Sequence, residues 1–227
     1  MHKEDQLYLN MGSGRTRLVL ELLHNANRTI NDVSIFRYFE EYCTQLKSSK
    51  QDEKEVYWKV AYYEKLIDYI KIILAFETYS KALLIKKGFM IHTIDRKFSK
   101  DLSQKQKDGL PVRIEEFYEE KLKVNKTIPN RNSVSGLLES GETIAFSKIL
   151  KDPYQEILQF DNMLVHHLKN INAKRNRLHL YSDFTEAFKI QQHISEWAFI
   201  KVISTSLIKN EFLQTQLEYE LQLSNSD

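Results

Sequence analysis

The feature that most restricts the fold of this chain is a long series of hydrophobic residues at helical spacing. Between residues 56 and 74 they recur every three or four positions: Val56, Val60, Tyr63, Ile67, Ile70 and Leu74. This spacing predicts one stripe on a continuous α-helix, and we expect the stripe to face inward. The pattern can run on to about Lys87, where Gly88 is suited to end the helix. Other faces of the segment are also apolar, which predicts cover from more than one side.

Low glycine and proline contents favour long helices with few connections. The 227 residues include 6 Gly and 3 Pro, a small supply for a fold with many tight turns. No internal repeat, low-complexity linker or shift in composition divides the chain. We therefore predict a single all-α domain, an up-and-down helical bundle. Its parts are an N-terminal helical extension (1–50), a core (55–210) with an irregular insertion at about 89–152, and a C-terminal tail (211–227).

Weaker patterns flank the long helix on both sides. Residues 17–46 have the pattern of two helical pieces that are split near residues 25–27. Residues 90–109 lack a clear period and predict irregular structure. Pro111 is predicted to open a short helix over residues 114–122, because proline is common in a first helical turn. The polar residues that follow, to about 132, predict a loop.

The helical signal returns after Pro153. Five hydrophobic residues step by three or four positions: Ile157, Phe160, Leu164, Leu168 and Ile171. Asp183, with Glu186 three residues later, resembles a capping box that begins a last long helix. That helix is predicted to reach about Asn210, and residues 211–221 can extend it.

Cysteine use and hydropathy indicate a cytoplasmic protein. The single cysteine, Cys43, cannot form an internal disulfide, and a reducing compartment is the natural setting for it. No uncharged apolar run approaches the ~20 residues that a membrane span requires. The apolar stretch from Ile70 to Phe76 is interrupted by Lys71. We therefore expect no membrane association.

Charge is concentrated in one part of the second half of the chain. The net charge of +2 does not by itself indicate nucleic-acid binding. Between Asn162 and Ser182, however, there is no acidic residue, whereas seven are basic or titratable: His166, His167, Lys169, Lys174, Arg175, Arg177 and His179. Such a window is suited to a phosphate backbone. A solvated helix end, where cations offset the macrodipole, is the alternative.

Arg175 and His179 carry the most chemistry in this window. They are four positions apart, so a helix would put both side chains on one face. Arginine stays charged and binds phosphate oxygens through its planar fork, and histidine exchanges a proton near neutral pH. With Asn176 as a neutral hydrogen-bonding group, these residues could cut RNA without a metal or cofactor.

The stretch Arg175-Asn176-Arg177-Leu178-His179 resembles the signature of the HEPN family of helical-bundle proteins. That signature is an Arg, a polar residue and then a His. The stretch from Glu77 to Gly88, with Lys81-Ala82-Leu83-Leu84 inside it, resembles a helix end that many such proteins share: a Glu, then Lys-Ala-Leu-Leu, then a Gly. The resemblance covers about residues 55–210 and implies a HEPN-like bundle.

The resemblance also implies a function. Many HEPN proteins are metal-independent endoribonucleases of toxin–antitoxin or antiphage-defence systems, and they work as homodimers with two motifs in one basic cleft. It implies catalytic roles for Arg175, Asn176 and His179, and leaves room for an antitoxin or regulatory protein partner. RNA would be held by neighbouring side chains of the window: Lys174, Arg177, Lys169 and His167. Glu77 would orient Arg175, although a local ion pair between Glu77 and Lys81 is the simpler interpretation.

A rival hypothesis is a non-catalytic helical module that binds RNA, a nucleotide or a protein partner through the same basic end. Three residues separate Arg175 from His179, one fewer than in the usual signature, and this favours the rival. A structural helical adaptor with a chance motif is the third alternative.

Three other motifs have weaker functional readings. His166 and His167 are adjacent and would point about 100° apart on a helix, so they do not make a metal-ligand set. Residues 12–15 lack the features of a phosphate-binding loop. A second basic run is most simply solvated surface: Lys121, Lys123, Lys126 and Arg131.

Overall fold

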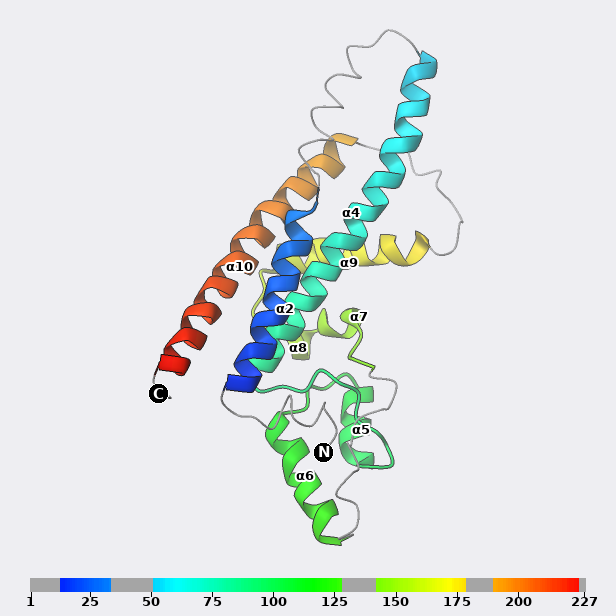
Figure 1. The fold of residues 1–227 in the computed structure, drawn as a ribbon. Helices are drawn as coiled ribbons and strands as arrows, with labels where there is room; N and C mark the ends of the chain where they lie inside the picture. Colours follow the sequence, from blue (N-terminus) through cyan, green and yellow to red (C-terminus); the bar gives the residue numbers. More distant parts are fainter. Residues whose placement is uncertain (1–12, 34–50, 128–141, 179–189, 225–227) are drawn as a thin grey trace. The chain divides into compact units, whose positions relative to one another are not determined.

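The structure, a computed structural model, describes residues 13–33, 51–127, 142–178 and 190–224 (Figure 1). These residues form eight helices and no strands, which confirms the all-α prediction. The helices are α2 (Ser13–Asn31), α4 (Gln51–Lys86), α5 (Lys100–Lys107), α6 (Ile114–Thr127), α7 (Phe146–Ile149), α8 (Asp152–Leu158), α9 (Asn162–Leu178) and α10 (Ile190–Ser224).

The chain divides into two compact units. The first contains Met1–His24, Thr78–Phe160 and Glu211–Asp227, and the second contains Asn25–Glu77 and Asp161–Asn210. Helices α2, α4 and α10 each contribute to both units. The single domain expected from the sequence stays a prediction.

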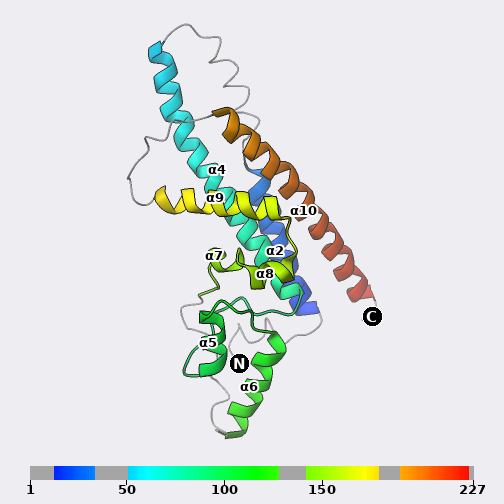
Figure 2. The same cartoon turned by 180° about the vertical axis from the view of Figure 1, so that it is seen from behind.

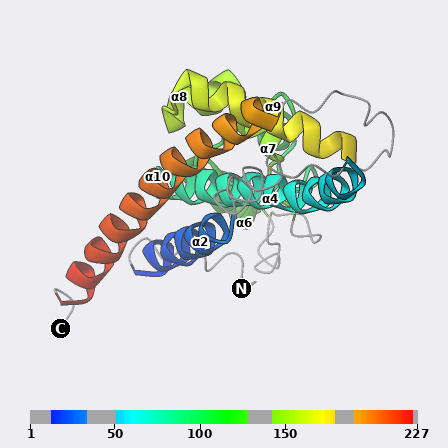
Figure 3. The same cartoon turned by 90° about the horizontal axis from the view of Figure 1, so that it is seen from above.

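In the second unit, α4 is buried on a broad face that differs from the predicted stripe. Its buried side chains are Asp68, Tyr69, Ile72, Ile73, Ala75 and Phe76. The prediction that the stripe faces inward is wrong for its described members, since Ile67 is 53% exposed, Ile70 45% and Leu74 51%. The neighbouring face carries larger and aromatic side chains, so its burial removes more apolar area from water. Figure 3 shows α9, which belongs to the same unit, on one side of this part of α4.

In the first unit, the end of α4 is closed by a glycine. Gly88 has a φ of +84°, in the left-handed region. The Gly88 N–H donates to the Ile85 carbonyl (3.0 Å), and the Phe89 N–H donates to the Leu84 carbonyl (2.8 Å). These two bonds form a Schellman motif, which satisfies carbonyls that the helix leaves open. The predicted end of the helix at Gly88 is confirmed.

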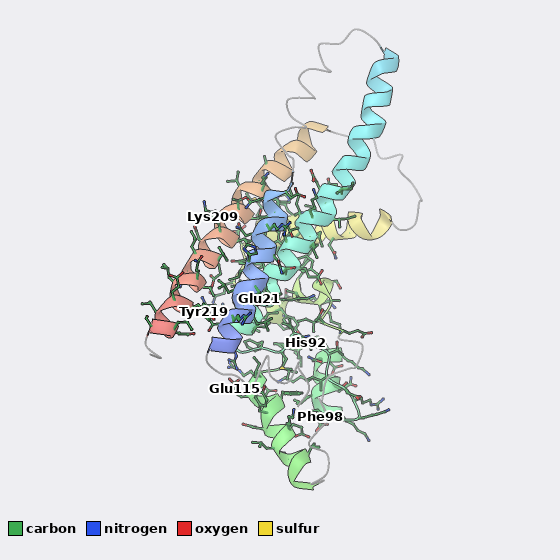
Figure 4. The ribbon with its side chains drawn as sticks, viewed as in Figure 1. Glu21, His92, Phe98, Glu115, Lys209 and Tyr219 are labelled. Carbon is green, nitrogen blue, oxygen red and sulfur yellow. The ribbon has the colours of Figure 1, made fainter. Side chains whose placement is uncertain are left out.

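The segment predicted to be irregular contains the short helix α5. Ser99 caps it, since its side chain accepts a hydrogen bond from the Leu102 N–H. Gln106 is 4% exposed and binds a neighbouring extended segment. Its amide donates to the His92 carbonyl (2.9 Å), and its carbonyl accepts from the Ile94 N–H (2.8 Å). These contacts are not local in sequence, which is why the pattern of residues 90–109 did not predict the helix. His92 is labelled in Figure 4.

Helix α6 begins at Ile114, as predicted, but continues to Thr127, so the loop predicted from residue 121 is wrong as far as residue 127. Pro111 lies outside the helix, because the backbone first forms an isolated bridge between Phe89 and Arg113. Phe117 is 1% exposed and anchors the helix against Phe98, with ring centroids 5.1 Å apart.

Two other predicted boundaries differ from the structure. Helix α2 runs unbroken through residues 25–27, because Ala26 is fully buried there. The stripe predicted after Pro153 is divided between α8 and α9, since Gln159 adopts φ 58° and ends α8. Helix α10 extends through residues 211–221, as predicted. Asp183 and Glu186 lie outside the described residues.

Lys86 joins two helices of the first unit at their C-terminal ends. Its ammonium contacts the carboxylates of Glu211 and Glu218, each at 2.9 Å, and donates to the Thr215 hydroxyl at 3.2 Å. Partial burial alone would lower the pKa of Lys86, but the hydrogen bonds and charges of the two glutamates outweigh it and raise the pKa. Burial and then the charge of Glu211 raise the pKa of Tyr79.

We predict that Gly88→Ala lowers the free energy of unfolding by about 1 kcal/mol, because an L-residue in the left-handed region is strained. A Cβ at Gly88 would meet only Glu115 Oε1 at 3.7 Å, so strain and not a clash sets the cost. Gly88→Asn should lose less, since asparagine tolerates this conformation. Urea unfolding at an unchanged m-value measures both. Equal losses for alanine and asparagine would contradict this account.

Candidate functional site

The candidate site is built on α9, in the second unit. The helix begins after Asp161, whose carboxylate accepts hydrogen bonds from the N–H groups of Met163 (2.9 Å) and Leu164 (3.2 Å). Leu164, Leu168 and Ile171 are fully buried along one face. In Figure 1 and, from behind, in Figure 2, α9 crosses α4 at a steep angle. The capped start and the buried stripe fix the register of the helix that leads into the basic window.

The first part of the basic window lies on the opposite side of α9. His166, Lys169 and Asn170 are exposed, and the His166 ring is 3.0 Å from the Asn170 amide. His167 is half-buried, and its ring meets Phe199 of α10 edge-on at 5.2 Å between centroids. Lys169 can therefore reach a ligand in solvent, whereas His167 is held against a neighbouring helix.

The structure confirms a helical backbone for Lys174, Arg175, Asn176 and Arg177, because α9 continues to Leu178. Their side chains lie outside the part of the chain that the structure describes. His179 directly follows the last helical residue and is also outside it. The convergence of Arg175, Asn176 and His179 on one phosphate stays a prediction.

Position 175 continues the spacing of the buried residues along α9. It follows Ile171 by four residues and Leu168 by seven, which is the spacing of the buried stripe itself. The backbone position of Arg175 therefore continues the register of the buried stripe.

Glu77, the predicted partner of Arg175, is half-buried at the end of the α4 segment in the second unit. Its predicted contact with Arg175 involves a side chain outside the described residues and stays a prediction. In the first unit, Lys81 donates to the Thr143 hydroxyl at 2.9 Å. This bond connects α4 to the segment that follows residue 141.

A lysine clamp on the end of α2 is a feature that the sequence analysis missed. The Lys71 ammonium donates to the Asp32 carbonyl (3.0 Å) and contacts its carboxylate (2.6 Å). Lys201 of α10 donates to the Val33 carbonyl. Cations at a helix C-terminus satisfy open carbonyls and offset the macrodipole. The sequence contained a sign of this contact. Lys71 interrupts an apolar run, and a charge among apolar residues needs a polar partner.

The remaining candidate motifs show no arrangement that indicates a site among the described residues. Lys123 lies 3.4 Å from Glu120 on the surface of α6, and the side chains of Lys126 and Arg131 are not described. Ser13, Gly14 and Arg15 belong to the first turn of α2. Among the described residues, no group of three His, Cys, Asp or Glu side chains is placed to bind a metal. Within the same residues, none of the helices combines the length and apolar character needed to span a bilayer.

Comparison of the chain with protein-family models, curated proteins and solved structures gave no match.

The clamp on α2 predicts a pH-dependent contribution to stability. The hydrogen bond and then the charge of Lys71 lower the pKa of Asp32. A lowered pKa in the folded state stabilises the protein above the unfolded-state pKa, and this is lost as the pH falls through the folded-state pKa. Asp32→Asn should therefore destabilise the protein at pH 7, and the difference should shrink below about pH 4.

Urea unfolding at several pH values measures this difference. Asp108→Asn is the matched control, because its hydrogen bond from Gln104 is retained when the carboxylate becomes an amide. A loss in Asp32→Asn that stays constant down to the acid limit of folding would argue against the ion pair.

Proposed function

We propose that this protein is a HEPN-type, metal-independent endoribonuclease with its catalytic residues at the C-terminal end of α9. The observation that carries the proposal is the acid-free basic window, whose helix is described through Arg175 as far as Leu178. The buried stripe and the Asp161 cap of the same helix supply the rigid support that a catalytic arginine requires.

The proposed reaction uses the ribose 2′-OH as the nucleophile. The bond from the 2′-oxygen to phosphorus forms while the bond to the 5′-oxygen breaks, which leaves a 2′,3′-cyclic phosphate and a 5′-OH end. One imidazole accepts the proton of the 2′-OH, and an imidazolium donates a proton to the departing 5′-oxygen. Arg175 stabilises the charge on the non-bridging oxygens. Asn176 orients the substrate or His179.

The position of Arg175 in the last described turn of α9 supports these roles. The negative end of the macrodipole favours a protonated imidazole and a guanidinium there. Each chain carries one histidine in the motif, so a homodimer would supply both the acid and the base. Lys169, Lys174, Arg177 and His167 would hold the RNA backbone, and Glu77 would orient Arg175.

The resemblance supports a toxin–antitoxin or antiphage-defence role in the cytoplasm, with an antitoxin or another regulatory protein as the partner. The rival function is a non-catalytic module that binds RNA, a nucleotide or a protein at the same helix end. The short spacer between Arg175 and His179 favours this rival.

We predict that the protein cleaves RNA in the presence of EDTA, and that His179→Ala lowers kcat by ~10²–10⁴-fold because proton transfer is lost. Arg175→Ala should lower kcat by a similar factor, because charge in the transition state is no longer stabilised. His166→Ala is the control. It removes an exposed imidazole from the same helix and should leave kcat unchanged.

Single-turnover cleavage of a labelled RNA, with analysis of the product ends, measures these effects. The absence of cleavage by the wild type, together with salt-dependent RNA binding that Arg175→Ala weakens, would replace the enzyme with the binding module. Equal activity in the wild type, His179→Ala and His166→Ala would exclude the motif as the catalytic site.

A further inference from the structure

A lysine, a histidine and a threonine from three separate segments meet in the first unit. His92 lies in the segment that follows α4 (Figure 4), and it pairs with Thr143 through an isolated antiparallel bridge. The Lys81 ammonium of α4 donates to the Thr143 hydroxyl at 2.9 Å. The bridge and this hydrogen bond bring together residues that are far apart in the sequence.

The backbone hydrogen bonds place the side chains of His92 and Thr143 on the same face. One bond of 2.8 Å lies on each side of the pair: from the Thr93 N–H to the Glu142 carbonyl, and from the Ile144 N–H to the Ile91 carbonyl. His92 and Thr143 therefore form a non-hydrogen-bonded pair, the type in which opposite side chains are closer. In such a pair the two Cβ atoms are about 4.5–5.5 Å apart.

Buried contacts hold the backbone of this pair in position. Gln106 is buried, and its amide donates to the His92 carbonyl at 2.9 Å. Ile91 and Ile144, which adjoin His92 and Thr143 in the chain, are each 5% exposed. Neighbouring side chains of an extended segment point to opposite faces, so the two isoleucines anchor the other face in the core. Support of this kind keeps the polar groups of a binding site in place.

The chemistry of the three side chains suits an oxyanion. The Lys81 ammonium has three donors, of which one serves the Thr143 hydroxyl. A hydroxyl that accepts a hydrogen bond can still donate its own hydrogen, and an imidazole can donate from a ring nitrogen. All three residues are half-buried, so a bound anion would lose part of its water and gain charge-assisted hydrogen bonds.

The number and origin of the donors favour a phosphate over a carboxylate. A phosphate monoester presents three terminal oxygens, and three side chains from three segments can each donate to one of them, whereas a carboxylate has two oxygens in one plane. The acidic neighbour of Thr143 does not oppose this anion. Glu142 precedes Thr143 in an extended segment, so its exposed side chain points to the opposite face.

We propose that Lys81, His92 and Thr143 bind the phosphate group of a small phosphate monoester in the first unit. The ammonium contacts one terminal oxygen, and the hydroxyl and the imidazole donate to the other two. The site uses none of the residues of the proposed ribonuclease motif, and the proposal does not rest on that activity. Free phosphate and a nucleoside monophosphate share this chemistry.

Titration of the full-length protein with inorganic phosphate, AMP and adenosine tests the proposal. The ring signals of the 7 histidines are followed by NMR at constant pH and ionic strength, and His92→Gln identifies the signal of His92. Phosphate and AMP, at concentrations up to ~10 mM, should shift this signal to saturation, whereas adenosine should not. Saturation by AMP at a lower concentration than phosphate supports a nucleotide ligand, and saturation at equal concentrations supports phosphate itself.

A pair of threonine variants provides the matched comparison. Thr143→Val removes the hydroxyl but keeps the branched shape, and it should weaken phosphate binding by ~10-fold. Thr93→Val makes the same change beside His92, on the opposite face, and should leave the Kd unchanged. Lys81→Met should weaken binding by ~10–100-fold, because a charged donor is lost. Circular dichroism establishes that each variant is folded, and the threonine pair decides the proposal even where Lys81→Met does not fold.

Three results would overturn the proposal. The first is a His92 signal that responds to neither phosphate nor AMP in the wild type. The second is equal weakening of phosphate binding by Thr143→Val and Thr93→Val. The third is a response to adenosine as strong as the response to AMP, which would show that the base and not the phosphate is bound.

Discussion

The burial of α4 is the constraint on which the rest of the structure depends. This helix of 36 residues is apolar on several faces, so a single neighbour cannot cover it. In the second unit, Ile72, Ile73 and Phe76 are fully buried, and in the first unit Leu84 and Ile85 are. Each such side chain contributes roughly 1.5–3 kcal/mol of hydrophobic stabilisation. Both units are therefore built around parts of one helix.

Contacts at helix ends set where α2 and α4 end and where α9 begins. The left-handed Gly88 ends α4, the ammonium groups of Lys71 and Lys201 close the end of α2, and Asp161 opens α9. These contacts satisfy backbone groups that a helix leaves open at its ends. They also set the direction in which the chain continues, which at α9 is toward the basic window.

The existence of helices was more predictable than their faces and their ends. Periodicity indicated α4 and its end at Gly88, but it could not identify the buried face, because Ile67 and Ile72 are equally apolar. Helix α5 depends on contacts that Gln106 makes with residues outside the helix. The end of α8 at Gln159 could not be predicted from the local sequence. The residue in the left-handed region there is a glutamine, whereas glycine is the residue that usually marks such a helix end. Of the candidate site, the helical setting of Arg175 was predictable, because the stripe through Ile171 leads into it.

The proposed activity rests on a guanidinium and an imidazole that together replace a metal ion in phosphodiester cleavage. The most direct measurement uses an RNA in which a single nucleotide, on the 5′ side of a mapped cleavage site, lacks its 2′-OH. The account predicts that this bond is no longer cut in EDTA, while other sites in the same strand are still cut and yield 2′,3′-cyclic phosphate ends. Cleavage of the 2′-deoxy bond at an unchanged rate, or products with 3′-OH ends, would contradict it.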